Sequence, residues 1–218
     1  MHAPTTTTEL ALSVCHSGSP ELMVLGPRTR ALYYEPKGGP LAPRFRLTAG
    51  QARALFGAPV SEFTDQVVPF LSPDAGQLAH RWTDAPLDPA AVLGPYLATA
   101  APAADRETRW VDAAAARLST GSPIAVVADD LGVSERHLRN RFAAAVGVSP
   151  KHYARIQRIR RVLGDIGSAP FAQLAAQAGY YDQSHLGREF RQLMGVSPAA
   201  FAAGHTPAPR HCSTLEAA

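Results

Sequence analysis

A duplicated segment limits the possible folds of this chain more than any other feature of its sequence. The tetrapeptide GVSP occupies residues 147–150 and returns at residues 195–198. The same residues precede both copies in the same order: Gly132, His137, Leu138 and Phe142 in the first, and Gly179, His185, Leu186 and Phe190 in the second. The second copy has one additional residue between its glycine and its histidine. A chance tetrapeptide would not keep these other residues in order, so a whole unit is duplicated.

Each unit is predicted to contain two helices joined by a tight turn. Apolar residues recur at the i, i+3, i+4, i+7 spacing of a helix over residues 124–131 and again over 138–146. The second unit repeats this pattern over 171–178 and 186–194. Gly132 and Gly179 supply the left-handed backbone that the turns need. Ser134 is placed to cap the second helix of the first unit.

The GVSP segments are predicted to end one helix and start the next. Gly147 and Gly195 stand just beyond a helix, where the backbone needs a positive φ. The valine after each glycine is expected to fold back onto the preceding phenylalanine. Ser-Pro then supplies an N-cap and a first helical residue. Between the units, KHYARIQRIRRVLGDI carries Ile156, Ile159, Leu163 and Ile166 at helical spacing. This helix is expected to be a rod of roughly 22 Å between the two units.

Residues 106–204 resemble the paired helix-turn-helix domain of the AraC/XylS transcription regulators. The resemblance rests on Leu-Ala-x-x-x-Gly-Tyr at 174–180, Asp-Gln-Ser-His-Leu at 182–186, Arg188-x-Phe190 and the two GVSP segments. A short helix, a glycine turn and a second helix form the helix-turn-helix outline, whose second helix can enter a DNA major groove. The resemblance implies a sequence-specific DNA-binding regulator with two recognition helices in successive major grooves.

Eight residues are predicted to contact DNA: Arg136, Arg139, Asn140, Lys151, Gln183, Ser184, Gly187 and Arg188. With the leucines and phenylalanines inward, all but Lys151 lie on the outward faces of the two recognition helices. Arginine can bind guanine, and asparagine or glutamine adenine, through two hydrogen bonds each. The resemblance implies base contacts at these seven positions, and Lys151 is expected near a phosphate.

Other polar residues of this region have structural alternatives. An exposed arginine is most often a solvated charge, and Arg155, Arg158 and Arg161 can pair with acids elsewhere. His137 and His185 are expected to pack or to cap turns. Tyr180 and Tyr181 are expected to pack in the second turn.

The first hundred residues are predicted to mix strands and helices. Short apolar runs (LALSV, LMVLG, RALYYE and RFRL) indicate strands. Thr48 is expected to cap a helix that ends at Gly57, and Ser72 to cap a second helix that begins at Pro73. Residues 24–70 resemble the amino-terminal domain of AraC-type regulators with a cupin-like sensing part, on GP-x-T-R-A, R-F-R-L, ARALFG-x-P and D-x-V-V-P. The segment before Thr48 is too short for the eight strands of a complete jelly roll.

The predicted class is therefore α+β: a small mixed module, then an all-α double helix-turn-helix domain. We predict a regulatory or dimerisation module at 1–86, a linker with a short helix at 87–105, the DNA-binding domain at 106–204 and a flexible tail at 205–218. Eight Lys or Arg residues and no acid lie between Arg136 and Arg161, although the net charge of the chain is only +3.

No catalytic residue, metal site or cofactor is predicted. Cys15 and Cys212 stand alone near opposite ends, which gives neither a zinc motif nor a disulfide framework. Neither a membrane-spanning run nor a signal peptide is found, so the expected location is the cytoplasm, at the nucleoid. His16 and His80 are expected to be isolated surface residues.

The expected partner is double-stranded DNA, with RNA polymerase and a second copy of the chain, through residues 1–86, as further partners. The sequence identifies no small-molecule effector. Two other functions stay open: a protein-binding adaptor with weak DNA affinity, and a DNA repair alkyl-acceptor that would use Cys15.

Overall fold

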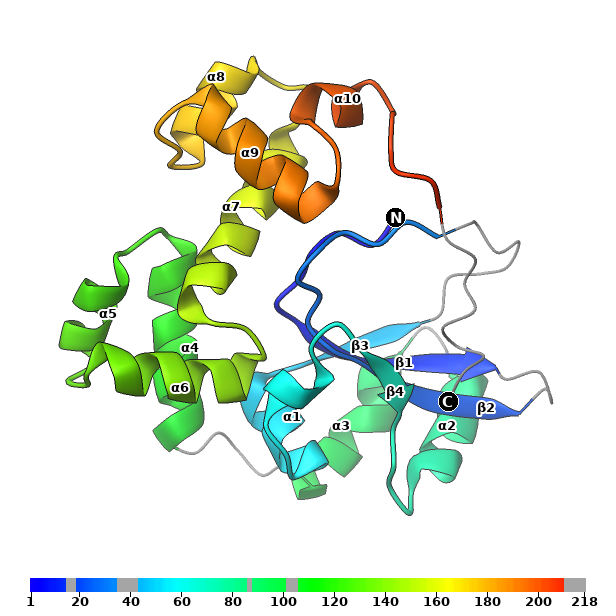
Figure 1. Cartoon of the computed structure of the whole chain (residues 1–218). Coiled ribbons are helices and arrows are strands. Elements are labelled where there is room, and N and C mark those ends of the chain that lie inside the picture. The colour runs from blue at the N-terminus through cyan, green and yellow to red at the C-terminus, as the bar shows by residue number, and fades with distance from the viewer. Residues whose placement is uncertain (15–18, 35–42, 86–87, 101–105, 210–218) are drawn as a thin grey trace.

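A computed structural model describes residues 1–14, 19–34, 43–85, 88–100 and 106–209 of the chain. Its strands and first three helices form the lower part of the molecule in Figure 1, and the remaining helices the left and the top. The α+β class predicted from the sequence is confirmed.

The first module is built on one antiparallel sheet. Strands β1 (Thr8–Val14), β2 (Pro20–Leu25), β3 (Arg44–Leu47) and β4 (Val67–Pro69) lie in the order β3-β1-β2-β4. Successive side chains of a strand point to opposite faces, so Leu10 and Leu12 face the main core while Ala11 is buried on the other side. Among the described residues the sheet has four strands, half the number in a jelly roll.

Three helices pack onto this core: α1 (Ala49–Phe56), α2 (Ala75–Asp84) and α3 (Pro89–Ala100). A short 3-10 helix, η1 (Val60–Phe63), follows α1. Trp82 of α2 and Leu93 of α3 are fully buried among the apolar side chains of β1 and β2. The helix predicted between Thr48 and Gly57 is confirmed, with a capping box at Thr48 and φ 61° at Gly57.

Two local predictions in this module are wrong. Helix α2 begins at Ala75 rather than Pro73, because Ser72 accepts a hydrogen bond from the Asp74 N–H within a turn (3.3 Å) instead of capping the helix. The run predicted as a strand at residues 30–35 forms only isolated bridges in its described part, such as Leu32 to His2.

Helix α3 belongs to the core of the first module. Val92, Leu93 and Leu97 are buried against the sheet and α2. The helix lies within residues 87–105, where the sequence predicted a linker with a short helix, and its packing joins residues 89–100 to the preceding module. Residues 86–87 and 101–105 lie outside the described part of the chain.

The two repeated units form two three-helix groups. The first consists of α4 (Arg106–Ser119), α5 (Ile124–Asp130) and α6 (Glu135–Val146). The second consists of α7 (Pro150–Asp165), α8 (Phe171–Gln177) and α9 (Gln183–Met194), followed by the short α10 (Pro198–Ala202). Each group has its own apolar core, centred on Phe142 in the first and on Phe190 in the second. Figure 1 shows α7 running from the first group to the second.

Both GVSP corners have the predicted glycine conformation and serine caps. Gly147 and Gly195 end α6 and α9 with φ values of 85° and 78°. Ser149 and Ser197 then cap α7 and α10, each of which begins with a proline. Of the predicted tail, residues 205–209 are described, and Pro207 lies against Gly195; residues 210–218 lie outside the described part.

Candidate nucleic-acid interface

Helix α6 presents a polar outer face because its apolar residues are taken up by the first core. Ser134 caps the helix by accepting a hydrogen bond from the His137 N–H (3.2 Å). Leu138 and Phe142 are fully buried. The predicted residues Arg136, Arg139 and Asn140 are exposed on the same helix. These side chains are therefore available to a ligand outside the protein.

The three exposed residues of α6 are not equivalent. Arg136 and Asn140 are one helical turn apart and form a row on the outward face. Arg139 forms an ion pair with Glu135, which is also one turn away. An exposed pair of this kind contributes little stability. Arg139 can therefore leave Glu135 for a stronger acceptor at low energetic cost.

Helix α9 repeats this construction and adds a hollow beside it. Asp182 caps the helix by accepting a hydrogen bond from the His185 N–H (2.6 Å). A hollow of about 450 Å³ lies beside α9, and all four predicted residues of this helix line it: Gln183, Ser184, Gly187 and Arg188. The other residues that line it are Arg191 of α9 and, from neighbouring elements, Phe171, Ser197, Pro198 and Ala199. The structure therefore brings all four predicted residues of the second unit together on one surface.

Gly187 leaves the middle of this hollow open. A Cβ atom added there would meet no other atom within 4 Å. The position therefore allows a close approach of the helix backbone to a ligand. Lys151 lies in a different element: it is exposed in the first turn of α7, at the first corner.

A buried acid ties α9 to α7, and the sequence prediction did not identify it. The side chain of Glu189 is 8% exposed, and one of its oxygens accepts a hydrogen bond from the Arg155 Nε–H (2.8 Å). The other oxygen accepts from Arg158 (3.1 Å) and from the Tyr180 hydroxyl (2.8 Å). The Arg158 guanidinium also lies 5.1 Å from the centre of the Tyr180 ring. This network confirms that Arg155 and Arg158 pair with an acid elsewhere.

The network also explains the ionisation of its members. Burial by itself would raise the pKa of Glu189, but the hydrogen bond from Tyr180 and the charge of Arg158 outweigh it and lower that pKa below its usual value. Burial and the neighbouring carboxylate raise the pKa of Tyr180. Glu189 is therefore ionised at neutral pH, and Tyr180 keeps its proton as a hydrogen-bond donor. The sequence contained an indication that Glu189 is buried, because Glu189 follows Leu186 by three positions and therefore lies on the apolar side of α9.

The histidines and tyrosines of the turns divide into packed and exposed residues. The His185 ring is half-buried and lies edge-on to Tyr180, which agrees with the predicted packing. The His137 ring also lies edge-on to an aromatic ring, that of Trp110, but His137 is exposed. Tyr181 was predicted to pack in the second turn, and this is wrong: it is 93% exposed. The additional residue of the second unit lies between Gly179 and the Asp182 cap, and it leaves Tyr181 pointing to solvent beside the start of α9.

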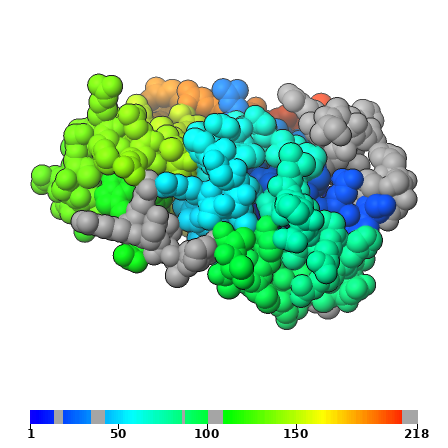
Figure 2. Space-filling model, turned by 90° about the horizontal axis from the view of Figure 1, so that it is seen from below, coloured from blue at the N-terminus to red at the C-terminus, as the bar shows by residue number. Residues whose placement is uncertain are grey.

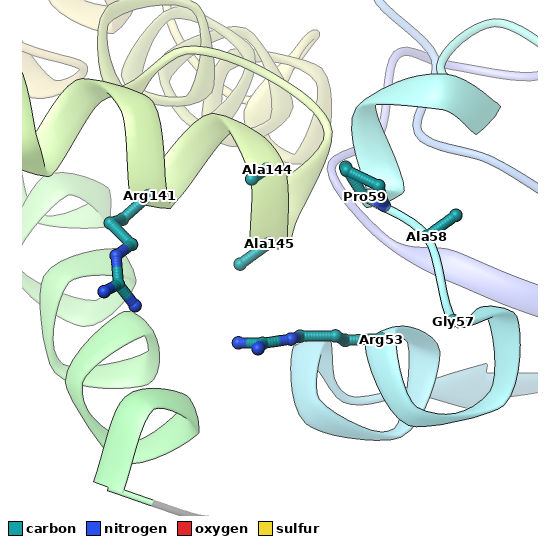
Figure 3. A pocket seen from close by; sticks show the side chains of 7 residues that line it. All are labelled: Arg53, Gly57, Ala58, Pro59, Arg141, Ala144 and Ala145. Atoms are coloured by element: carbon teal, nitrogen blue, oxygen red, sulfur yellow. The ribbon is translucent and has the colours of Figure 1, made fainter.

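A cleft of about 510 Å³ opens between α6 and the segment of the first module that runs from α1 to Pro59. Figure 3 shows Arg141 of α6 and Arg53 of α1 extending into this gap from opposite sides, with Ala144, Ala145 and Pro59 near them. Seen from below, helices of the first module and of the first helix-turn-helix unit lie side by side (Figure 2).

The described residues contain no group of three or more His, Cys, Asp or Glu side chains that could hold a metal ion. Within the same part of the chain, none of the helices has the length and hydropathy required to cross a membrane. Cys15, His16 and Cys212 lie outside the described residues.

Comparisons with known proteins find similarities in the helical part of the chain. Residues 127–204 match the helix-turn-helix domain family. The invasion protein InvF of Salmonella typhimurium is 33% identical over 85 residues, which are 38% of this chain and 39% of that protein. A putative AraC-like transcription regulator of Streptomyces antibioticus is 36% identical over 81 residues, 36% of this chain and 26% of that protein. This chain therefore spans less than half the length of these relatives.

One solved structure similar to this chain is the C-terminal domain of AraT, a response regulator from Geobacillus stearothermophilus. It is 22% identical and superposes with a TM-score of 0.43 over 48% of this chain and 92% of that domain.

Proposed function

We propose that this chain, whose residues 127–204 form a helix-turn-helix domain of the AraC type, is a sequence-specific DNA-binding regulator of transcription. Its recognition helices α6 and α9 would occupy successive major grooves on one face of a duplex. DNA is then the principal partner, and the protein acts by binding rather than by catalysis. RNA polymerase and a second copy of the chain, through residues 1–86, stay predicted partners.

The observation that carries this proposal is the identical construction of α6 and α9. Each helix has twelve residues, begins at a side-chain cap and ends at a glycine with positive φ. Each buries a Leu and a Phe and exposes polar residues in its first half, the part of a recognition helix that contacts base edges. Because α7 has 16 residues, it extends roughly 24 Å between the two units. A rod of this length, with the width of the two units added, would allow the two helices to reach the separation of about 34 Å between successive major grooves.

The exposed residues divide into roles according to their chemistry. Arg136 and Arg188 are suited to guanine, and Asn140 and Gln183 to adenine. Lys151, at a helix start beside the first corner, is suited to a phosphate.

The side chains on both helices favour a sequence-reading regulator over an adaptor that holds DNA loosely. An adaptor would bind cognate and unrelated DNA with similar affinity, whereas a regulator shows a large ratio between them.

Replacing Arg188 with alanine should relax the choice of base at one position of the site. We expect R188A to weaken binding to cognate DNA by about 1–3 kcal/mol, because one bidentate base contact is lost. Gel-shift titrations with cognate and scrambled duplexes measure both affinities. Arg81→Ala is the matched control, since Arg81 is exposed on α2 in the first module, and it should change neither affinity. Equal losses on both duplexes for R188A would assign Arg188 to a phosphate instead of a base.

A further inference from the structure

The first module contacts both helix-turn-helix units at the ends of their recognition helices. Two of its loops make these contacts: loop A (residues 26–33), which follows β2, and loop B (residues 59–66), which contains η1. Ala31 of loop A packs against the second core, and Ala49 at the start of α1 packs against the first. The relative position of α6 and α9 therefore depends on the first module as well as on α7.

Loop B holds the end of α6. The Thr64 hydroxyl donates a hydrogen bond to the Gly147 carbonyl (2.6 Å), which terminates the helix. The surroundings of Gly147 are close-packed, since an added Cβ would lie 2.8 Å from Pro27 Cγ and 3.2 Å from Val60 Cγ1. The first GVSP corner is thus fitted into a socket formed by both loops.

Loop A holds the end of α9. The Ala31 N–H donates to the Leu193 carbonyl (2.7 Å), and the hydroxyl of Tyr33, the last residue of the loop, donates to the Met194 carbonyl (2.8 Å). These carbonyls belong to the last turn of a helix, where carbonyl groups have no partner within the helix. The first module therefore satisfies acceptors at the ends of both recognition helices.

The two loops are joined so closely that they act as one piece. The Asp65 carboxylate accepts hydrogen bonds from the N–H (2.7 Å) and the hydroxyl (2.5 Å) of Thr29, and the Asp65 N–H donates to the Pro27 carbonyl (2.7 Å). Asp65 adopts φ 60°, a left-handed conformation that costs energy for a residue with a side chain. At Gly26 an added Cβ would lie 1.7 Å from the Phe63 carbonyl oxygen, so only glycine allows this approach.

The same module also lies along α7. The His152 Nε2–H donates to the Thr29 carbonyl (3.3 Å), Gln157 to the Thr6 hydroxyl (3.0 Å) and Arg160 to the Pro4 carbonyl (3.1 Å). These contacts follow one side of the helix from its first turn to its third. A rod that is held along its length cannot bend independently of the first module.

We propose that the first module determines which operator spacing the protein accepts, with Tyr33 and Thr64 as the residues that position α9 and α6. This inference rests on the proposed function and adds a specificity role for residues outside the helix-turn-helix domain. One base pair of additional spacing moves a half-site by about 3.4 Å and rotates it by roughly 35°. If the first module holds α6 and α9 in fixed positions, the two helices cannot adjust to the altered spacing. Without these contacts, they can.

The test uses the full-length protein and a series of duplexes. Each duplex carries the two half-sites selected by the wild type, at the selected spacing or with one base pair removed or added. We expect the wild type to prefer the selected spacing strongly. In the double variant Tyr33→Phe, Thr64→Val, which removes two hydroxyl donors and little volume, the ratio between selected and altered spacings should fall by about threefold to tenfold. Affinity for a duplex with one half-site should be unchanged.

A matched control exists within the first module. Tyr96→Phe and Thr83→Val remove hydroxyls that bond to the Ser72 hydroxyl and the Ala79 carbonyl, so both hydrogen bonds lie within the first module. The control pair should keep the wild-type spacing preference. The first module does not determine spacing if the Tyr33 and Thr64 variant also keeps the wild-type preference, or if it loses affinity equally at every spacing. If the wild type itself selects no sequence, the proposed function fails, and that result is separate from either outcome.

Discussion

The Glu189→Ala variant should lose about 3 kcal/mol of its free energy of unfolding. Removal of the Glu189 carboxylate would leave Arg155, Arg158 and the Tyr180 hydroxyl without their shared acceptor at the junction of α7 and α9. Removing one member of a buried ion pair is costly because the remaining charges stay desolvated. Urea denaturation of wild type and variant at pH 7 measures the difference.

Glu135→Ala is the matched control for this prediction. Glu135 also lies in a recognition helix and also pairs with an arginine, but its side chain is 42% exposed. An exposed pair contributes at most about 1 kcal/mol. Comparable losses in the two variants would show that the burial of Glu189 has no energetic consequence.

The effect of Glu189 should also depend on pH in a defined direction. Because the folded protein lowers the pKa of Glu189, the carboxylate stabilises the fold above its unfolded pKa of about 4.3. This contribution is lost as the pH falls through the folded value. The difference between wild type and E189A should therefore shrink in acid, and a difference that grew in acid would contradict the assignment.

The Gly147→Ala variant is the second change with a large expected effect. Alanine at φ 85° is strained, and its Cβ would collide with Pro27 and Thr64. Left-handed strain costs about 1–2 kcal/mol and overpacking a further 1–3 kcal/mol. We expect a total loss of about 3 kcal/mol, measured by the same urea titration.

Gly132→Ala separates the two causes. Gly132 also has a positive φ (65°), but a Cβ there would meet no atom within 4 Å. This variant should therefore lose only the strain term, about 1–2 kcal/mol. Equal losses of unfolding free energy at Gly132 and Gly147 would mean that the residues around Gly147 move to accommodate the added Cβ without an energetic penalty.

The sequence was a good guide where structure depends on neighbouring residues. Gly147, Ser149 and their counterparts in the second corner determine backbone conformation through their own chemistry, so the helix ends were predictable. The outward faces of α6 and α9 followed from the spacing of leucine and phenylalanine for the same reason. Ser72 is the exception among the caps, because a Ser-Pro pair can also form a turn before the helix begins.

Features that depend on distant contacts were not predictable in this way. The network of Glu189 joins α9 to α7, and the loops of the first module reach residues far along the chain. The residues next to Tyr33 and Thr64 in the sequence do not indicate that these hydroxyls donate hydrogen bonds to the ends of recognition helices. Tyr181 was mispredicted because an additional turn residue changes the direction of its side chain, which apolar spacing does not report.

Selection of bound DNA from a random pool tests the central claim most directly. If α6 and α9 occupy successive major grooves, the selected sequences contain two short half-sites whose centres lie about 10 base pairs apart. A single half-site, or two half-sites with no fixed separation, would show that the paired helices do not bind one duplex together.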